Sequence, residues 1–124
     1  MDNVSILYVD DEENNLLLFK ANFRKKYNVL LAQSGSEGLE QLSAHQGEII
    51  VVISDMRMPK MSGIEFIRQA KDKYPEIAYF ILTGFEFNHE IDKALKDATI
   101  QKFFTKPFDA GDIESAIEEI KNSF

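Results

Sequence analysis

The chain has 124 residues, which is the length of one domain spanning residues 1–124 and allows about two-thirds of the unfolded surface to be buried. Its composition is typical of a globular protein, and its net charge of −7 argues against direct nucleic acid binding, which requires clustered Lys and Arg. Cysteine, a signal peptide and an apolar run of about 20 residues are all absent, so we expect no disulfide, no thiolate metal site, no membrane contact and a cytoplasmic location.

The N-terminal part of the chain alternates two strands with two helices. Residues 4–9 are apolar and rich in β-branched side chains, which predicts a buried strand, and residues 29–32 predict a second strand. Residues 13–26 between them have the apolar period of a helix. One face of this helix carries Leu16, Phe19, Phe23 and Tyr27. Ser34 and Glu37 match the S-x-x-E capping box, which predicts that a second, short helix begins here.

The central part follows the same alternation. Residues 49–54 show no polar alternation, as expected for a strand that is covered on both faces. Ser62 and Glu65 form another capping box in front of a helical pattern, and residues 78–82 predict a fourth strand.

The C-terminal part adds a helix over residues 88–97, a short strand over residues 102–105 and a last helix over residues 109–120, which Asp109 can cap. Residues 109–120 carry five acidic residues and no basic one, which is typical of a solvated helix face.

Five strand–helix units in succession predict an α/β fold, a single doubly wound domain whose parallel strands have helices on both faces and right-handed crossovers. In such a sheet, ligands bind beyond the carboxyl ends of the strands, where the strand order reverses. The polar side chains at those ends are Asp10, Asp11, Asp55, Thr83 and Lys106. We therefore expect these side chains to share one edge of the sheet.

The three carboxylates at this edge require a cation to compensate their negative charges. Asp10, Asp11 and Asp55 would raise one another's pKa values unless their charges were compensated. Oxygen ligands without cysteine, in a chain poor in histidine, suit Mg²⁺ or Mn²⁺ better than Zn²⁺ or Cu²⁺. The alternative is that Asp10 or Asp11 only caps the first helix.

The same set of residues suits phosphoryl transfer. An ionised Asp55 can act as a nucleophile and form an aspartyl phosphate without a general base. Catalysis then consists of positioning and charge neutralisation, which Lys106, the Thr83 hydroxyl and a divalent ion can supply. The simpler alternatives are a surface salt bridge for Lys106 and an ordinary strand-end threonine.

Together with the D-x-x-M-P run from Asp55 to Pro59, Gly63 and the Lys106-Pro107-Phe108 triplet, these residues resemble the receiver domain of two-component response regulators. The resemblance extends from Ser5 to about Ile120. It implies a flavodoxin-like fold with a five-stranded parallel sheet of order 2-1-3-4-5.

The resemblance also implies roles for single residues. Asp55 would be the phosphoacceptor; Asp11 would bind Mg²⁺ directly, Asp10 partly through water, and Arg57 through its backbone carbonyl. Thr83 and Lys106 would contact the phosphoryl group.

Four further positions follow from the resemblance. Phe103 would be the switch aromatic, although core packing is an alternative. The Lys106–Pro107 bond would be cis, against the roughly 5–6% base rate for such bonds. Arg57 and Phe85 would flank the phosphoryl group and set its lifetime, and we expect Phe85 to shield it from water.

The implied function is that of a two-component receiver. It accepts phosphate from a histidine kinase or phosphotransfer protein and switches the surface of its fourth helix, fifth strand and last helix, which controls an output protein or domain. A homodimer that forms on phosphorylation is a further expectation. The chain is expected to be no enzyme, although it assists its own phosphorylation and dephosphorylation. The alternative is an inactive, receiver-like docking module.

Overall fold

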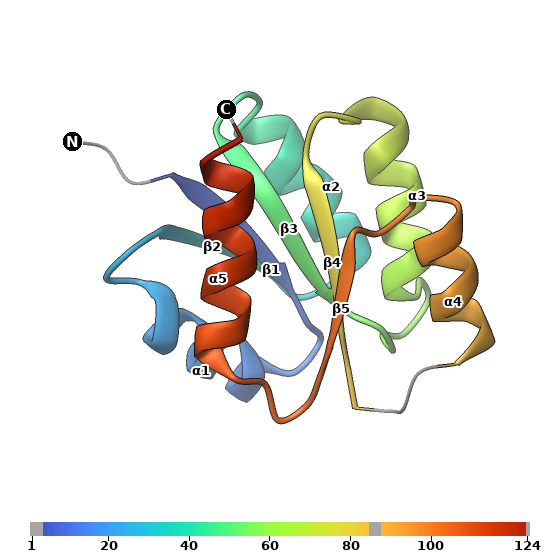
Figure 1. The fold of residues 1–124 in the computed structure, drawn as a ribbon, viewed down its shortest axis with the longest axis horizontal. Coiled ribbons are helices and arrows are strands. Elements are labelled where there is room, and N and C mark those ends of the chain that lie inside the picture. Colours follow the sequence, from blue (N-terminus) through green and yellow to red (C-terminus); the bar gives the residue numbers. More distant parts are fainter. Residues whose placement is uncertain (1–3, 85–87, 124) are drawn as a thin grey trace.

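The computed structural model describes residues 4–84 and 88–123. Strands and helices alternate along this part of the chain (Figure 1). The strands are β1 (Ser5–Val9), β2 (Asn28–Ala32), β3 (Ile49–Asp55), β4 (Ala78–Thr83) and β5 (Lys102–Thr105). The helices are α1 (Glu13–Phe23), α2 (Gly35–Ala44), α3 (Gly63–Lys73), α4 (His89–Lys96) and α5 (Ala110–Lys121).

The five strands form one parallel sheet in the order β2-β1-β3-β4-β5, which confirms the predicted fold. β1 lies between β2 and β3, so the strand order reverses beside it. The register pairs Val9 of β1 with Ser54 of β3, and Thr83 of β4 with Thr105 of β5. The carboxyl ends of four neighbouring strands are therefore level with one another.

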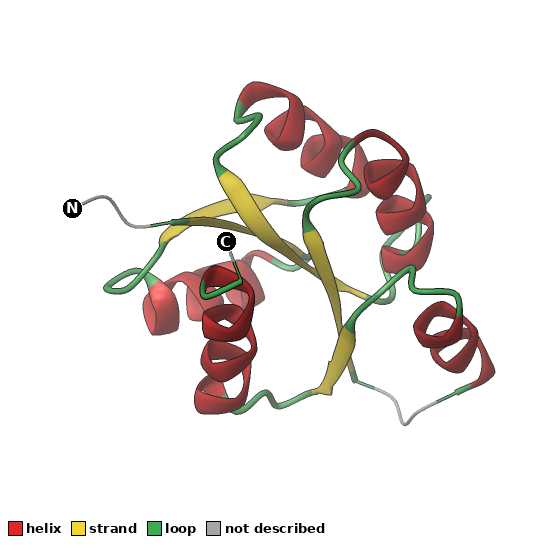
Figure 2. Ribbon diagram, turned by 45° about the horizontal axis from the view of Figure 1, so that its top comes forward, coloured by secondary structure: helices red, strands yellow, loops and turns green. Residues whose placement is uncertain are grey.

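Helices cover both faces of the sheet (Figure 2). Alternate residues of β1 point to opposite faces. Leu7 and Val9 pack in the cluster that contains buried residues of α2, α3 and α4, whereas Ile6 and Tyr8 pack in the cluster that contains those of α1 and α5. This explains why the strand sequences lack polar alternation.

The first helix is shorter than predicted. α1 ends at Phe23, and the backbone N–H groups of Lys26 and Tyr27 both donate to the Phe23 carbonyl in a turn. Tyr27 nevertheless stays buried, because this turn brings its ring to 6.5 Å from that of Phe23. The prediction to residue 26 was wrong because Tyr27 continues the apolar period of the helix without belonging to it.

Polar side chains cap three of the helices as the sequence indicated. Ser62 and Glu65 form the complete reciprocal capping box of α3, and Asp109 accepts from the N–H of Asp112 at the start of α5. Only half of the predicted box forms at α2. Ser34 accepts from the Glu37 N–H, but the Glu37 carboxylate accepts from Gln33 and not from Ser34.

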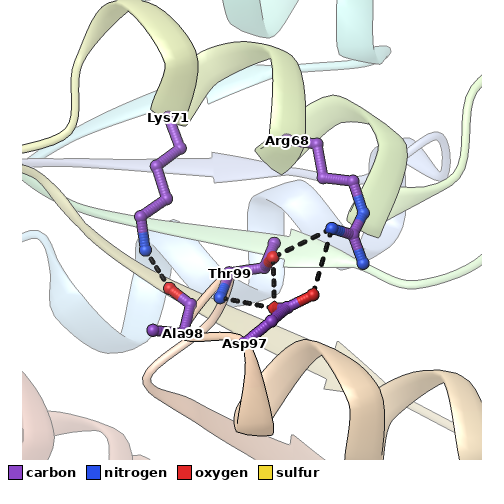
Figure 3. Close-up of polar contacts among 5 residues, drawn as sticks. All are labelled: Arg68, Lys71, Asp97, Ala98 and Thr99. Carbon is purple, nitrogen blue, oxygen red and sulfur yellow. Dashed lines mark hydrogen bonds and ion pairs between the residues drawn. The ribbon is translucent and has the colours of Figure 1, made fainter.

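A polar network joins α3 to the turn between α4 and β5 (Figure 3). Arg68 donates to Asp97 at 3.3 Å and to the Thr99 hydroxyl at 3.1 Å. Asp97 accepts from the Thr99 hydroxyl at 2.6 Å and from its backbone N–H at 3.0 Å. Lys71 donates to the carbonyl of Ala98, which has a left-handed backbone with φ of 63°. The C-terminal end of α4 is thus tied to α3.

In residues 4–84 and 88–123, every helix is too short or too polar to cross a lipid bilayer.

Candidate functional site

The sheet register brings the predicted acids together. Asp10 directly follows β1 and Asp55 is the last residue of the neighbouring β3. Oxygen atoms of Asp10, Asp11 and Asp55 lie within 4.8 Å of one another. Strand pairing therefore brings Asp10 close to Asp55, and Asp11, the next residue along the chain, completes a three-carboxylate cluster at the edge where the strand order reverses.

Asp10 lies deepest in the cluster. It is fully buried, whereas Asp55 is 7% exposed and Asp11 lies at the surface. Its Oδ1 accepts from the Glu12 N–H at 3.0 Å. The N-cap residue of α1 is Glu12, which makes no side-chain capping bond, so the alternative that Asp10 or Asp11 only caps this helix is wrong.

Two uncharged donors hold the other oxygen of Asp10. The Tyr8 hydroxyl donates to Oδ2 at 2.6 Å, and the Asn15 side-chain amide donates to the same atom at 3.2 Å. Burial, followed by the hydrogen bond to Asp10, raises the pKa of Tyr8 well above its usual range. The phenol therefore remains a donor.

Lys106 faces both buried acids. Its Nζ lies 2.9 Å from Asp55 Oδ1 and 3.5 Å from Asp10 Oδ2. The side chain is 27% exposed, so this is a largely buried ion pair and not the solvent-exposed one of the simpler alternative. The backbone N–H of Lys106 donates to the Thr83 carbonyl at 2.7 Å, and the Lys106–Pro107 peptide bond is cis.

The two partners of this pair respond differently to burial. Burial raises the pKa of Asp55, the negative charges of Asp10 and Asp11 raise it further, and Lys106 opposes this only in part. For Lys106, burial lowers the pKa, but the hydrogen bond and charge of Asp55 outweigh it and raise the pKa overall. Lys106 is therefore held as an ammonium ion beside a carboxylate whose negative charge is under-compensated.

A small pocket of about 180 Å³ opens over the Asp55 carboxylate. Its lining residues are Glu12, Asp55, Met56, Arg57, Thr83, Gly84 and Lys106. Thr83 is buried, and Arg57 is exposed at the rim. The structure thus gathers Asp55, Thr83, Lys106 and Arg57 around one space.

Phe103, the predicted switch aromatic, lies away from this space. Phe103 sits on β5 opposite Ile81 and packs, partly buried, against the core cluster of α2, α3 and α4; it does not line the pocket over Asp55. Phe85, expected to shield the phosphoryl group, lies outside the described residues.

The close approach of the backbone requires a glycine at position 63, shortly after β3. Its N–H donates to the Met56 carbonyl at 2.8 Å. A Cβ at this position would lie 2.2 Å from the Asp55 backbone oxygen. The loop can therefore fold back onto the end of β3 only without a side chain at the first residue of α3.

The reasoning from sequence missed Tyr8 and Asn15. The available signals were a tyrosine two positions before Asp10, on the same strand face, and an amide one helical turn into α1. Both residues also line a larger groove of about 600 Å³, which runs from Lys106 to the exposed side chain of Leu18.

The donor set of the cluster fits a hard divalent cation. Three carboxylates offer oxygen ligands only, and one of the three acids is exposed to solvent, which matches the preference of Mg²⁺ for a few carboxylates together with retained water. Asp10, Asp11 and Asp55 are the residues that would hold such an ion.

Comparison with known proteins gives a consistent result. A family model described as the response regulator receiver domain matches residues 6–118. The chain is 32% identical to the transcriptional regulatory protein ZraR of Escherichia coli K12 over 119 residues, which are 95% of this chain but 26% of that protein. It is 31% identical to the alkaline phosphatase synthesis transcriptional regulatory protein PhoP of Bacillus subtilis, over 95% of this chain and 48% of PhoP. The chain therefore spans a half or less of these relatives.

Solved structures resemble the whole chain. A response regulator receiver domain protein from Clostridium thermocellum superimposes with a TM-score of 0.86 at 34% identity, covering 97% of this chain and 95% of that one. The signal receiver domain of an HD domain-containing protein from Pseudomonas fluorescens Pf-5 gives 0.86 at 26% identity, over 98% and 96% of the two chains.

Proposed function

Because the chain belongs to the response regulator receiver domains of two-component systems, we propose that it accepts a phosphoryl group on Asp55 in a Mg²⁺-dependent reaction. The observation that carries this proposal is the position of Lys106 Nζ, 2.9 Å from Asp55 Oδ1 and on the rim of the same pocket as Thr83. The Asp55 carboxylate, the Lys106 ammonium group and the Thr83 hydroxyl then surround one space that can hold a phosphoryl group.

The geometry supports a direct transfer. A carboxylate oxygen of Asp55 attacks the phosphorus of a phosphohistidine, the new O–P bond forms, and the N–P bond to the donor imidazole breaks. Lys106 stays protonated and neutralises one equatorial oxygen, while the Thr83 hydroxyl is placed to donate to another. A divalent cation on Asp10, Asp11, Asp55 and the Arg57 carbonyl would supply further charge neutralisation. Asp55 needs no general base because its attacking form is the ionised one.

A change at Thr83 can reach the output surface through β5. Phosphate on Asp55 would draw the Thr83 hydroxyl toward it, and Phe103 on the adjacent strand would fill the space that is vacated. Phosphorylation then shifts the population between two packings of α4, β5 and α5. Phe103 already packs on the α4 side of the sheet, which supports this route.

In this proposal the chain is a phosphoacceptor and not an enzyme with its own turnover substrate, although it assists gain and loss of its phosphoryl group. Its partners are a histidine kinase or phosphotransfer protein and an output protein or domain. A homodimer that forms on phosphorylation is a further proposal.

The test is the intact mass of the protein after incubation with acetyl phosphate. We expect one added phosphoryl group on the native chain with Mg²⁺, none with EDTA, and none on Asp55→Asn. Asp72→Asn, which removes an exposed acid of α3, is the matched control and should behave as the native chain does. Phosphate retained on Asp55→Asn would refute the site, and no phosphate on the native chain would favour an inactive docking module.

A further inference from the structure

We propose that Tyr8 is a positioning residue that fixes the Asp10 carboxylate for the divalent cation and limits its ion pair with Lys106. This inference rests on the proposed function. It starts from the 2.6 Å hydrogen bond that the buried Tyr8 hydroxyl donates to Asp10 Oδ2. An O–H···O⁻ bond of this length is charge-assisted and among the stronger hydrogen bonds in proteins.

The tyrosine ring is itself held in place. It stacks on Phe19 of α1 with centroids 4.1 Å apart and planes 10° from parallel. Phe19 and Phe23 in turn pack on Phe108, at 5.8 Å and 6.0 Å. One aromatic cluster therefore lies beneath both the Asp10 carboxylate and the segment that follows Lys106, so the hydroxyl has little freedom to leave Asp10.

The hydroxyl competes with Lys106 for the same oxygen. Lys106 Nζ stands 3.5 Å from Asp10 Oδ2 but 2.9 Å from Asp55 Oδ1. Because Tyr8 and Asn15 already donate to Oδ2, the ammonium group lies closer to Asp55 than to Asp10, although it forms an ion pair with both. The two buried acids thus differ in their main partner. Asp55 forms the closer ion pair with Lys106, and Asp10 remains available to the divalent cation.

Removing the Tyr8 hydroxyl should reduce this difference between Asp10 and Asp55. In Tyr8→Phe the ring and its stack on Phe19 remain, but Oδ2 loses its closest donor and can approach Lys106. The closer ion pair would then compete with the cation for Asp10. Groups that orient a metal ligand typically contribute 10–100-fold to metal affinity, so we expect Tyr8→Phe to weaken Mn²⁺ binding about tenfold.

The readout is the dissociation constant of Mn²⁺, measured from the electron paramagnetic resonance signal of the free ion, together with the melting temperature of each variant without metal. Tyr79→Phe is the matched control. It also removes a buried tyrosine hydroxyl, one that donates to the Tyr74 carbonyl at 2.8 Å, remote from the acids. Asn15→Ala, on the exposed side of the cluster, should give a smaller loss than Tyr8→Phe.

The outcomes distinguish a failure of the role assigned to Tyr8 from a failure of the proposed function. Weaker Mn²⁺ binding in Tyr8→Phe, with native affinity in Tyr79→Phe, supports the assignment. Native Mn²⁺ affinity in Tyr8→Phe, whatever its melting temperature, overturns the assignment and leaves the proposed function intact. Failure of the native chain itself to bind Mn²⁺ overturns both.

Discussion

Replacing Gly63 with alanine should displace Asp55, the proposed phosphoacceptor, through the backbone. The added Cβ would stand 2.2 Å from the Asp55 carbonyl oxygen, 3.1 Å from its carbonyl carbon and 3.0 Å from the Ile81 Cδ1 atom. The nearest of these atoms belongs to the main chain and cannot rotate away. Either the start of α3 or the end of β3 must move, and the Ser62–Glu65 capping box holds the helix start where it is.

The magnitude follows from this contact. Restoring an ordinary van der Waals separation requires a shift of about 1 Å. Overpacking of this kind costs about 1–3 kcal/mol, and the better helix propensity of alanine offsets up to about 1 kcal/mol. We expect a net loss of about 1–2 kcal/mol, or a fall in melting temperature of about 4–8 °C. A 1 Å misplacement of the reacting group should also slow phosphorylation by about 100-fold.

Two assays with one control test this reasoning. Thermal denaturation gives the stability, and the rate of phosphorylation by acetyl phosphate gives the effect on the site. Gly38→Ala is the matched control, because its Cβ would meet the Phe66 ring at 2.7 Å, in the packing of α2 against α3. We expect Gly38→Ala to lose stability and yet be phosphorylated at nearly the native rate. A Gly63→Ala protein with native stability and native rate would refute the argument.

Three further predictions concern pH and hydrogen bonding. Burial raises the pKa of Asp55 above its ordinary 3.8, so the stability that protonated Asp55 confers on the metal-free fold is present below pH 3.8 and lost as pH rises through the higher folded value. In EDTA, the melting temperature of Asp55→Asn should therefore exceed that of the native chain by a margin that grows as the pH rises above 3.8, and a margin independent of pH would contradict this. Tyr27→Phe removes the 2.6 Å bond to Glu118 and should cost about 1 kcal/mol in urea unfolding; an unchanged midpoint would show that the bond contributes nothing. The Thr99 hydroxyl and N–H lower the pKa of Asp97, so its contribution to stability is present above pH 3.8 and lost as pH falls through the lower folded value. Asp97→Asn should flatten this part of the acid unfolding curve, and a native curve would contradict it.

The sequence predicts the sheet and the site edge for one physical reason. Parallel strands that are buried on both faces appear as continuous apolar runs, and their carboxyl ends must lie at a common edge. Asp10, Asp55 and Lys106 could therefore be placed together before any distance was known. The strand bounds differ from prediction by single residues, such as Asp55, which belongs to β3.

What the sequence could not provide depends on partners from distant segments. The acids of α5 lie on a solvated face, as the sequence indicates, but the sequence does not show that Glu114 pairs with Lys26 and Glu119 with Lys102 on that face. The apolar run over residues 4–9 predicts a buried strand, but it does not show that the Tyr8 hydroxyl bonds to Asp10 at 2.6 Å. A helical or strand period shows which face is buried, but it does not show which polar atom meets which.

The central claim is that Asp10, Asp11 and Asp55 jointly bind one divalent cation beside Lys106. The most direct measurement is anomalous X-ray diffraction from crystals of the native chain grown with Mn²⁺. The account predicts a single strong anomalous peak among the three carboxylates, with Lys106 Nζ on the opposite side of Asp55. An anomalous peak at another place would contradict it. So would a site without an ion, in which the three carboxylates point away from one another.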